Sequence, residues 1–144
     1  MFWYDVDMSL IQKTTVRGRL SFTYQGLPFR FQIPTGVPRF GLSQYNSLQV
    51  SMPRDFVEWF RQLEQVLCPL TPFASNIKYA SLQMKVDDLS VVFDHEGNAL
   101  GDAFAEGYLK GEKVVALIEI PGCYFYNKMN GITIRAVQLK KMKS

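Results

Sequence analysis

The 144-residue chain has little cysteine and histidine, the residues on which many metal and nucleophilic sites depend. Its two cysteines, Cys68 and Cys123, are too few and too widely separated to indicate a disulfide framework or a CxxC site. Its one histidine, His95, lies between Asp94 and Glu96, and no further ligands follow at a recognisable metal-site spacing. The sequence therefore predicts no metal, no cofactor and a reducing, intracellular compartment.

Long apolar runs, catalytic motifs and a secretory signal are also missing. No apolar run approaches the ~20 residues that a membrane-spanning helix needs. The first residues, Met1 to Asp5, show neither the positive region nor the apolar segment of a signal peptide. There is no P-loop and no paired Ser/His/Asp or Cys/His pattern, and the adjacent acids Asp87 and Asp88 are most simply turn formers. We expect an intracellular protein that is neither secreted nor an enzyme.

The chain is nonetheless well supplied with the residues of a folded core. Hydrophobic residues make up 47% of it and charged residues 20%, proportions typical of a globular protein rather than a disordered one. A chain of 144 residues is most simply one domain, residues 1–144, large enough to bury a sizeable core.

Charge is unevenly distributed along the chain, although the net charge is only +3. Residues 1–50 hold 5 basic and 2 acidic side chains, a net charge of +3. Residues 51–110 hold 5 basic and 9 acidic side chains, a net charge of −4. Residues 111–144 hold 6 basic and 2 acidic side chains, a net charge of +4. A fold that brings the two ends together would therefore carry a positive face of the kind that attracts nucleic acid.

Alternating apolar residues predict a β-hairpin between residues 9 and 33, with a turn at Gln25-Gly26. Each strand is apolar on one face. The opposite face presents polar side chains, namely Arg17, Arg19, Arg30 and Gln32. These residues either contact a ligand or form the solvated outer face of a sheet, which is the more common fate of such residues.

Residues 34–47 are rich in proline and glycine and are predicted to form a loop. The loop contains Arg39 and Phe40, a cation and an aromatic residue with no evident role in a core. Phe40 is a candidate for ligand contact, although an aromatic plug packed beneath the loop explains it equally well.

Residues 53–67 are predicted to form the one long helix. Pro53 suits the first helical position. Apolar residues recur at spacings of three and four and form a stripe: Phe56, Phe60, Leu63 and Leu67, widened by Trp59 and Val66. The acidic outer face of this helix would repel a nucleic acid, so we expect the helix to be scaffolding.

Further strands are predicted on either side of the helix, at residues 47–52, 79–86 and 89–93. In the second of these, Lys85 faces away from the apolar side chains. Residues 94–98 carry a strong turn signal, so we interpret His95 as a solvated turn residue.

The most informative stretch is residues 111–141. Two β-rich runs, 114–120 and 132–141, are connected through a short polar turn that ends at Gly131, a pattern that predicts a hairpin. Val114, Ala116, Ile118 and Ile120 share the apolar face of the first run. Arg135 alternates with the apolar residues of the last run.

An aromatic cluster lies between these two runs. Tyr124 and Tyr126 are two residues apart and would project from one face, with Cys123 and Phe125 pointing the other way into the core. The tyrosines are either ordinary half-buried strand residues or a platform on which bases stack, with nearby cations such as Lys128 holding phosphates.

Six or seven strands in hairpins, with one helix between them, indicate a mostly β protein. The layout predicts an OB-fold-like antiparallel β-barrel with one long helix, at about residues 53–67, inserted between strands.

The order of these features resembles the bacteriophage T7-type single-stranded DNA-binding proteins and related proteins of large DNA viruses. Their valine-rich Val-x-Asp-x-x-Gly turn is matched by residues 92–97. Their pattern of Tyr-x-aromatic-Asn followed by Gly is matched by Tyr124, Tyr126, Asn127 and Gly131. The apolar strand after Lys110-Gly111 matches the strand leading into that pattern, and the stretch around residues 31–34 and 40–41 is similar to the viral branch.

The resemblance covers most of the chain and implies an OB-fold that binds single-stranded DNA without sequence preference. Phage members end in a long acidic tail that recruits replication proteins. This sequence ends in Lys140-Lys141-Met142-Lys143-Ser144, so recruitment through such a tail is not expected to carry over.

Two functions follow as alternatives. The first is a viral protein of DNA replication or recombination that binds single-stranded DNA, with replication proteins and a second copy of the chain as further conceivable partners. The second is an OB-type module that binds another protein. The candidate nucleic-acid-binding residues are Arg17, Arg19, Arg30, Arg39, Phe40, Lys85, Tyr124, Tyr126, Lys128 and Arg135.

Overall fold

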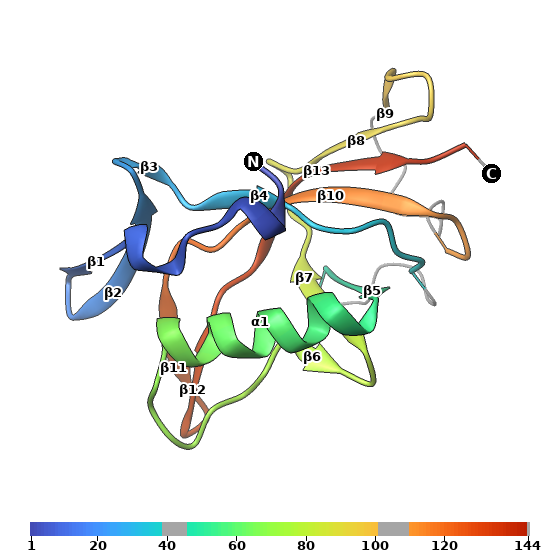
Figure 1. Cartoon of the computed structure of the whole chain (residues 1–144). Helices are drawn as coiled ribbons and strands as arrows, with labels where there is room; N and C mark the ends of the chain where they lie inside the picture. Colours follow the sequence, from blue (N-terminus) through green and yellow to red (C-terminus); the bar gives the residue numbers. More distant parts are fainter. Residues whose placement is uncertain (39–45, 101–109, 144) are drawn as a thin grey trace.

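The structure, a computed structural model, describes residues 1–38, 46–100 and 110–143. Within these ranges the chain is mostly β with one α-helix (Figure 1). The strands form a curled main sheet, a three-stranded sheet near the N-terminus and a two-stranded hairpin. The predicted mostly β, OB-fold-like architecture with one inserted helix is confirmed, with the main sheet curled into a half-barrel.

The three-stranded sheet follows two short 3-10 helices, η1 (Trp3–Asp5) and η2 (Met8–Leu10). Its strands β1 (Ile11–Val16), β2 (Arg19–Tyr24) and β3 (Leu27–Pro28) pair antiparallel. Two-residue turns join them, at Arg17-Gly18 and at the predicted Gln25-Gly26, and all four turn residues have positive φ. Tight hairpin turns require this conformation. Arg17 therefore lies in a turn rather than on a strand face.

The main sheet has the strand order β4 (Arg30–Gln32), β10 (Val114–Glu119), β13 (Arg135–Lys141), β7 (Ser81–Lys85) and β5 (Ser47–Ser51). Short strands extend it: β6 (Ile77–Lys78) pairs with β7, and β8 (Val91–Phe93) pairs with both β13 and β9 (Ala99–Leu100). Most pairs are antiparallel, as predicted. β13 runs parallel to β7 and β8, an arrangement that the long connections between these strands allow.

Helix α1 (Arg54–Leu67) lies along the side of the main sheet toward which the strands curl (Figure 1). Pro53 caps it with extended backbone geometry, so the observed helix begins one residue later than predicted. The predicted stripe is buried at Phe56, Phe60, Leu63 and Leu67, whereas Val66 is 40% exposed and lies outside it. No helix in the described ranges is long and apolar enough to cross a membrane.

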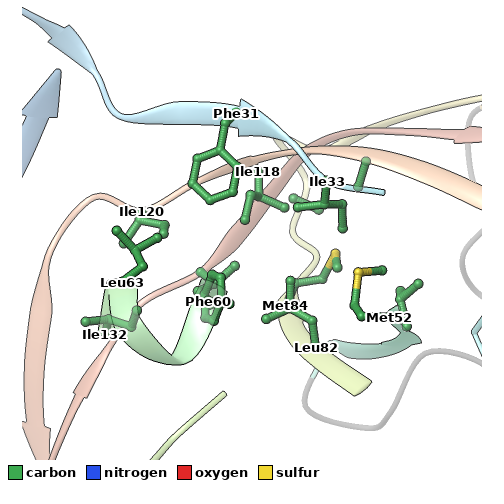
Figure 2. Close-up of a cluster of buried hydrophobic side chains, with 14 of the residues drawn as sticks. Phe31, Ile33, Met52, Phe60, Leu63, Leu82, Met84, Ile118, Ile120 and Ile132 are labelled. Atoms are coloured by element: carbon green, nitrogen blue, oxygen red, sulfur yellow. The ribbon is translucent and has the colours of Figure 1, made fainter. Parts of the chain in front are cut away.

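The core lies between α1 and the inner face of the sheet (Figure 2). Phe60 and Leu63 of the helix meet side chains from several strands, namely Phe31, Leu82, Met84, Ile118 and Ile132. The alternation predicted for these strands is confirmed, because in β10 the residues Val114, Ala116 and Ile118 are all at most 1% exposed.

One acidic residue of the helix is not on its outer face. Glu64 is only 3% exposed. The Ser75 hydroxyl donates to its carboxylate at 2.7 Å and the Asn76 backbone N–H donates at 2.9 Å. Burial nevertheless raises the pKa of Glu64 above its ordinary value. Glu64 therefore fastens the chain that follows the helix.

The aromatic stretch forms a separate hairpin of β11 (Cys123–Tyr126) and β12 (Met129–Ile132). Its turn consists of Asn127 and Lys128 alone, both with positive φ. The predicted longer turn ending at Gly131 is wrong, because residues 129–131 pair with β11. Figure 1 shows this hairpin projecting away from the main sheet, beyond one end of α1.

The projection of the hairpin overturns the expected burial of Phe125. Strand alternation does place Phe125 on the opposite face from Tyr124 and Tyr126, but on that side the core reaches only as far as Cys123. Phe125 is 67% exposed and Tyr126 is 77% exposed. Both faces of the hairpin near its turn are therefore open to solvent.

Candidate nucleic-acid interface

Three of the predicted cations lie on the outer face of the main sheet, the face directed away from α1. The strand register pairs Arg30 with Glu119, Glu119 with Arg135, and Arg135 with Lys85. Paired residues project from the same side of a sheet. These residues therefore form one row across β4, β10, β13 and β7, which we call the charged row.

Glu119 links the two arginines of the charged row. The Arg30 Nε–H donates to Glu119 Oε1 at 2.8 Å, and Arg135 Nη2 lies 3.6 Å from Glu119 Oε2. A second carboxylate, Asp87 Oδ1, lies 3.5 Å from Arg135 Nη1. Three cations thus face two carboxylates, and the row keeps a small positive excess.

The members of the charged row differ in accessibility. The Arg30 side chain is 42% exposed, whereas those of Arg135 and Glu119 are 17% and 13% exposed. Lys85 is exposed. A phosphate approaching this face would meet Arg30 and Lys85 first, and Arg135 would act mainly through its field.

A second row runs beside the charged row on the same face. Gln32, Leu117 and Gln138 are paired across β4, β10 and β13. The side-chain amides can donate and accept hydrogen bonds, and Leu117 offers an apolar contact. A bulge in β13 next to this row shifts the register, so that Ile118 pairs with Ala136 while Leu117 pairs with Gln138.

Two open pockets lie beside Pro121, next to the strands of the N-terminal sheet. One pocket, of about 300 Å³, is bordered by Glu119, Pro121 and residues of β2 and β3. The other pocket, of about 550 Å³, is also bordered by Pro121 and contains Arg17 and Arg19. Both pockets are lined by Pro121, and we name them together the Pro121 groove. It brings the two N-terminal arginines beside the chain that enters β11.

Gly122 allows the close packing that forms this groove. A Cβ on Gly122 would lie 2.4 Å from the backbone oxygen of Leu20, so only glycine fits there. The Phe22 N–H donates to the Pro121 carbonyl at 2.9 Å and holds β2 against the same segment.

The projecting hairpin carries the predicted tyrosines and Lys128. The Tyr124 ring covers Gly131 of β12, where a Cβ would lie 2.3 Å from Tyr124 Cζ. A glycine is thus required beneath the ring. Tyr126 is exposed next to the turn, and Lys128 is exposed within it.

The free edge of β12 is fixed by the chain that follows α1. The Asn130 N–H donates to the Pro72 carbonyl at 3.0 Å, and the Ala74 N–H donates to the Asn130 carbonyl at 2.8 Å. The Asn76 side chain also donates to the Ile132 carbonyl at 3.2 Å. These bonds hold the hairpin in a defined position relative to the core.

The predicted site residues therefore fall into three groups rather than one surface. Arg30, Lys85 and Arg135 lie on the charged row, Arg17 and Arg19 in the Pro121 groove, and Tyr124, Tyr126 and Lys128 on the hairpin. Arg39 and Phe40 lie outside the described residues. Sequence reasoning missed Glu119 as a partner of the arginines, and only the register between distant strands could have identified it.

Nucleophilic and metal-binding chemistry have little support in the described part of the chain. Burial, and the neighbouring Cys68, raise the pKa of the Cys123 thiol to about 12. A thiol with such a pKa is almost entirely protonated near pH 7 and is a poor nucleophile. His95 lies in the predicted turn, 3.6 Å from Glu96. No group of three or more His, Cys, Asp or Glu that could hold a metal occurs among the described residues.

Comparison with known proteins matches the chain at the level of structure only. No family model and no curated protein matches it. The chain is similar in structure to a single-stranded DNA-binding protein from bacteriophage Enc34, in complex with single-stranded DNA. The TM-score is 0.56 and the sequence identity 12%, and the match covers 94% of this chain and 96% of that chain.

Two further structures of the Enc34 protein are similar in the same way. The C-terminal truncation gives the same TM-score, identity and coverage. Another structure gives a TM-score of 0.56 and 13% identity over 93% of this chain and 90% of that chain. The chain therefore has the fold of a phage single-stranded DNA-binding protein. This likeness does not single out the T7-type branch.

Proposed function

We propose that the protein binds single-stranded DNA without sequence preference. The observation that carries the proposal is the charged row, in which three cations and Glu119 are held in register across four neighbouring strands of this fold. The fold it shares with the Enc34 protein adds support.

The binding mode follows from the chemistry of the three groups of residues. Arg30 and Lys85 supply accessible charge for phosphates on the outer face, and Arg17 and Arg19 continue that charge into the Pro121 groove. Exposed rings such as Tyr126 suit stacking, because every base has a π-face. Neither contact reads base edges, so little sequence dependence is expected.

The biological role belongs to the same proposal. A protein of this kind would protect or organise single strands during viral replication or recombination, as the resemblance to the T7-type and large-DNA-virus proteins implies. Replication proteins and a second copy of the chain are the partners to seek.

Fluorescence anisotropy with a labelled oligothymidylate and a duplex of equal length tests the proposal. Affinity should be higher for the single strand and should fall with salt, at a log–log slope of roughly −0.7 per phosphate contact. Equal affinity for duplex, or a flat salt response, would overturn the proposal. Absence of binding to either DNA would favour the protein-interaction module, for which the exposed Phe125 and Tyr126 offer a contact surface.

A further inference from the structure

The first five residues carry an aromatic pair that the sequence analysis did not consider. The Phe2 and Tyr4 rings are stacked, with centroids 5.4 Å apart and an interplanar angle of 14°. Both are accessible, since Phe2 is 45% exposed and Tyr4 is 64% exposed. Aromatic rings of this size are normally buried when they serve only the core.

The pair is held in place by the residue between its two members. Trp3 makes an edge contact with Tyr4 at 5.7 Å and packs on Phe56 and Trp59 of α1, each at 5.3 Å. A column of rings thus runs from the core to the surface. Because the outer rings are already ordered, a planar ligand stacking on them would lose little further conformational entropy.

The strand register places this pair beside the charged row. Phe2 forms a parallel bridge with Gln32, and the Gln32 N–H donates to the Met1 carbonyl at 2.8 Å. Phe2 therefore extends the row of Gln32 and Leu117 on the outer face. Arg30, an accessible cation, lies two residues from Gln32 on the same face, about 6.6 Å along the strand.

We propose that Phe2 and Tyr4 form a base-stacking site at the β4 edge of the sheet, with Arg30 binding the adjoining phosphate. The proposal rests on the proposed function, because it gives the outer face its aromatic contact. The ligand is a nucleobase of a single strand. A planar π-surface, an amide and a cation lie side by side here, and a nucleotide offers a base, polar sugar oxygens and a phosphate to match them. An apolar peptide would offer no anion to Arg30 and no polar group to the Gln32 amide.

The variants Phe2→Ala and Tyr4→Ala, measured with two probes, test this site. One probe is a labelled oligothymidylate, and the other is an abasic strand of equal length, which keeps the phosphates and lacks the bases. Each variant should bind oligothymidylate about 5-fold to 150-fold more weakly and bind the abasic strand as the wild type does. Arg30→Ala should weaken binding to both probes.

The control is Tyr79→Ala, because Tyr79 is 93% exposed in the β6–β7 turn, away from the charged row. It should bind both probes as the wild type does. Phe2→Leu keeps apolar bulk without a π-face, and it replaces Phe2→Ala if that variant melts early. Two outcomes would overturn the stacking site and leave the proposed function standing. In one, Phe2→Leu and Tyr4→Ala bind oligothymidylate as the wild type does. In the other, the variants lose equal affinity for both probes. A wild type that binds neither probe would overturn the proposed function with it.

Discussion

Replacing Glu119 with glutamine should strengthen the binding of single-stranded DNA. Glu119 is the carboxylate that joins Arg30 and Arg135. Glutamine keeps the shape and one acceptor oxygen for Arg30 and removes the negative charge. A phosphate on the outer face would then meet the same arginines without a competing anion.

The magnitude follows from the geometry of the ion pair. A phosphate bound to the far side of the Arg30 guanidinium would lie roughly 8 Å from the Glu119 carboxylate, since a hydrogen bond of about 2.8 Å lies on each side of the guanidinium. Two unit charges at this distance repel by about 0.5 kcal/mol in water and about 2 kcal/mol at an effective dielectric constant of 20. Glu119→Gln should therefore bind about 2-fold to 30-fold more tightly.

The assay is a titration of oligothymidylate at low salt, with Glu58→Gln as the matched control. Glu58 pairs with Arg54 on α1, so its replacement makes the same change in net charge on the helix side of the sheet. The gain for Glu119→Gln should shrink as salt rises, because the Debye length is about 10 Å at 0.1 M. The melting temperature should change little, because glutamine still accepts from the partly exposed Arg30 and Arg135 keeps its second carboxylate, Asp87.

Two results would refute this reasoning. Equal gains for Glu119→Gln and Glu58→Gln would mean that only net charge matters and that DNA does not contact the charged row. Weaker binding by Glu119→Gln, with unchanged melting, would mean that Glu119 holds Arg30 in its binding position and that its charge does not compete with phosphate.

Three further predictions follow from the structure. Arg19→Ala and Arg30→Ala should each weaken binding to all single-strand sequences and reduce the log–log salt slope by roughly 0.7 per lost phosphate contact. Each should cost less than about 1 kcal/mol of folding stability, and a large fall in melting temperature would contradict this. Phe125→Ala should melt like the wild type, whereas Phe31→Ala, in the core, should lose roughly 3–5 kcal/mol; similar losses in thermal unfolding would contradict the exposed position of Phe125. Glu64→Gln should gain stability relative to the wild type as the pH rises above about 4.3, the ordinary pKa of a glutamate. The pKa of Glu64 is raised in the folded protein, so the wild type loses stability as this buried carboxyl ionises. A difference in melting temperature that is constant between pH 4 and 8 would exclude this effect.

Much of the fold could be predicted from the sequence because its signals are local. The apolar stripe of residues 53–67 has helical period, and the inward residues of β10 alternate with period two. The Gln25-Gly26 turn has glycine at the second of its two positive-φ positions, a local signal for a tight hairpin turn. Each of these elements is specified within a few residues, so the sequence identified them correctly.

The errors arose where the answer depends on distant parts of the chain. Alternation correctly separated Phe125 from the tyrosines, but it could not show that β11 extends beyond the core. Glu64 is buried because the chain after the helix folds over it and supplies two donors, which the helix sequence alone does not indicate. The predicted site residues lie in separate groups for the same reason. Arg30 and Tyr126 were both chosen as residue types that bind nucleic acid, but they lie on different elements of the fold.

The pairing of β4 with β10 has a consequence for how the protein folds. Arg30 and Glu119 are 89 positions apart in the chain, so their contact closes a long loop. Such non-local pairings form slowly, whereas hairpins with two-residue turns, such as β1–β2 and β11–β12, form in about 1–10 μs. We expect a refolding chain to present its aromatic hairpin early and to acquire the charged row only in the final step. A nascent or partly unfolded molecule would then expose the aromatic side chains of the hairpin before the charged row could bind a phosphate.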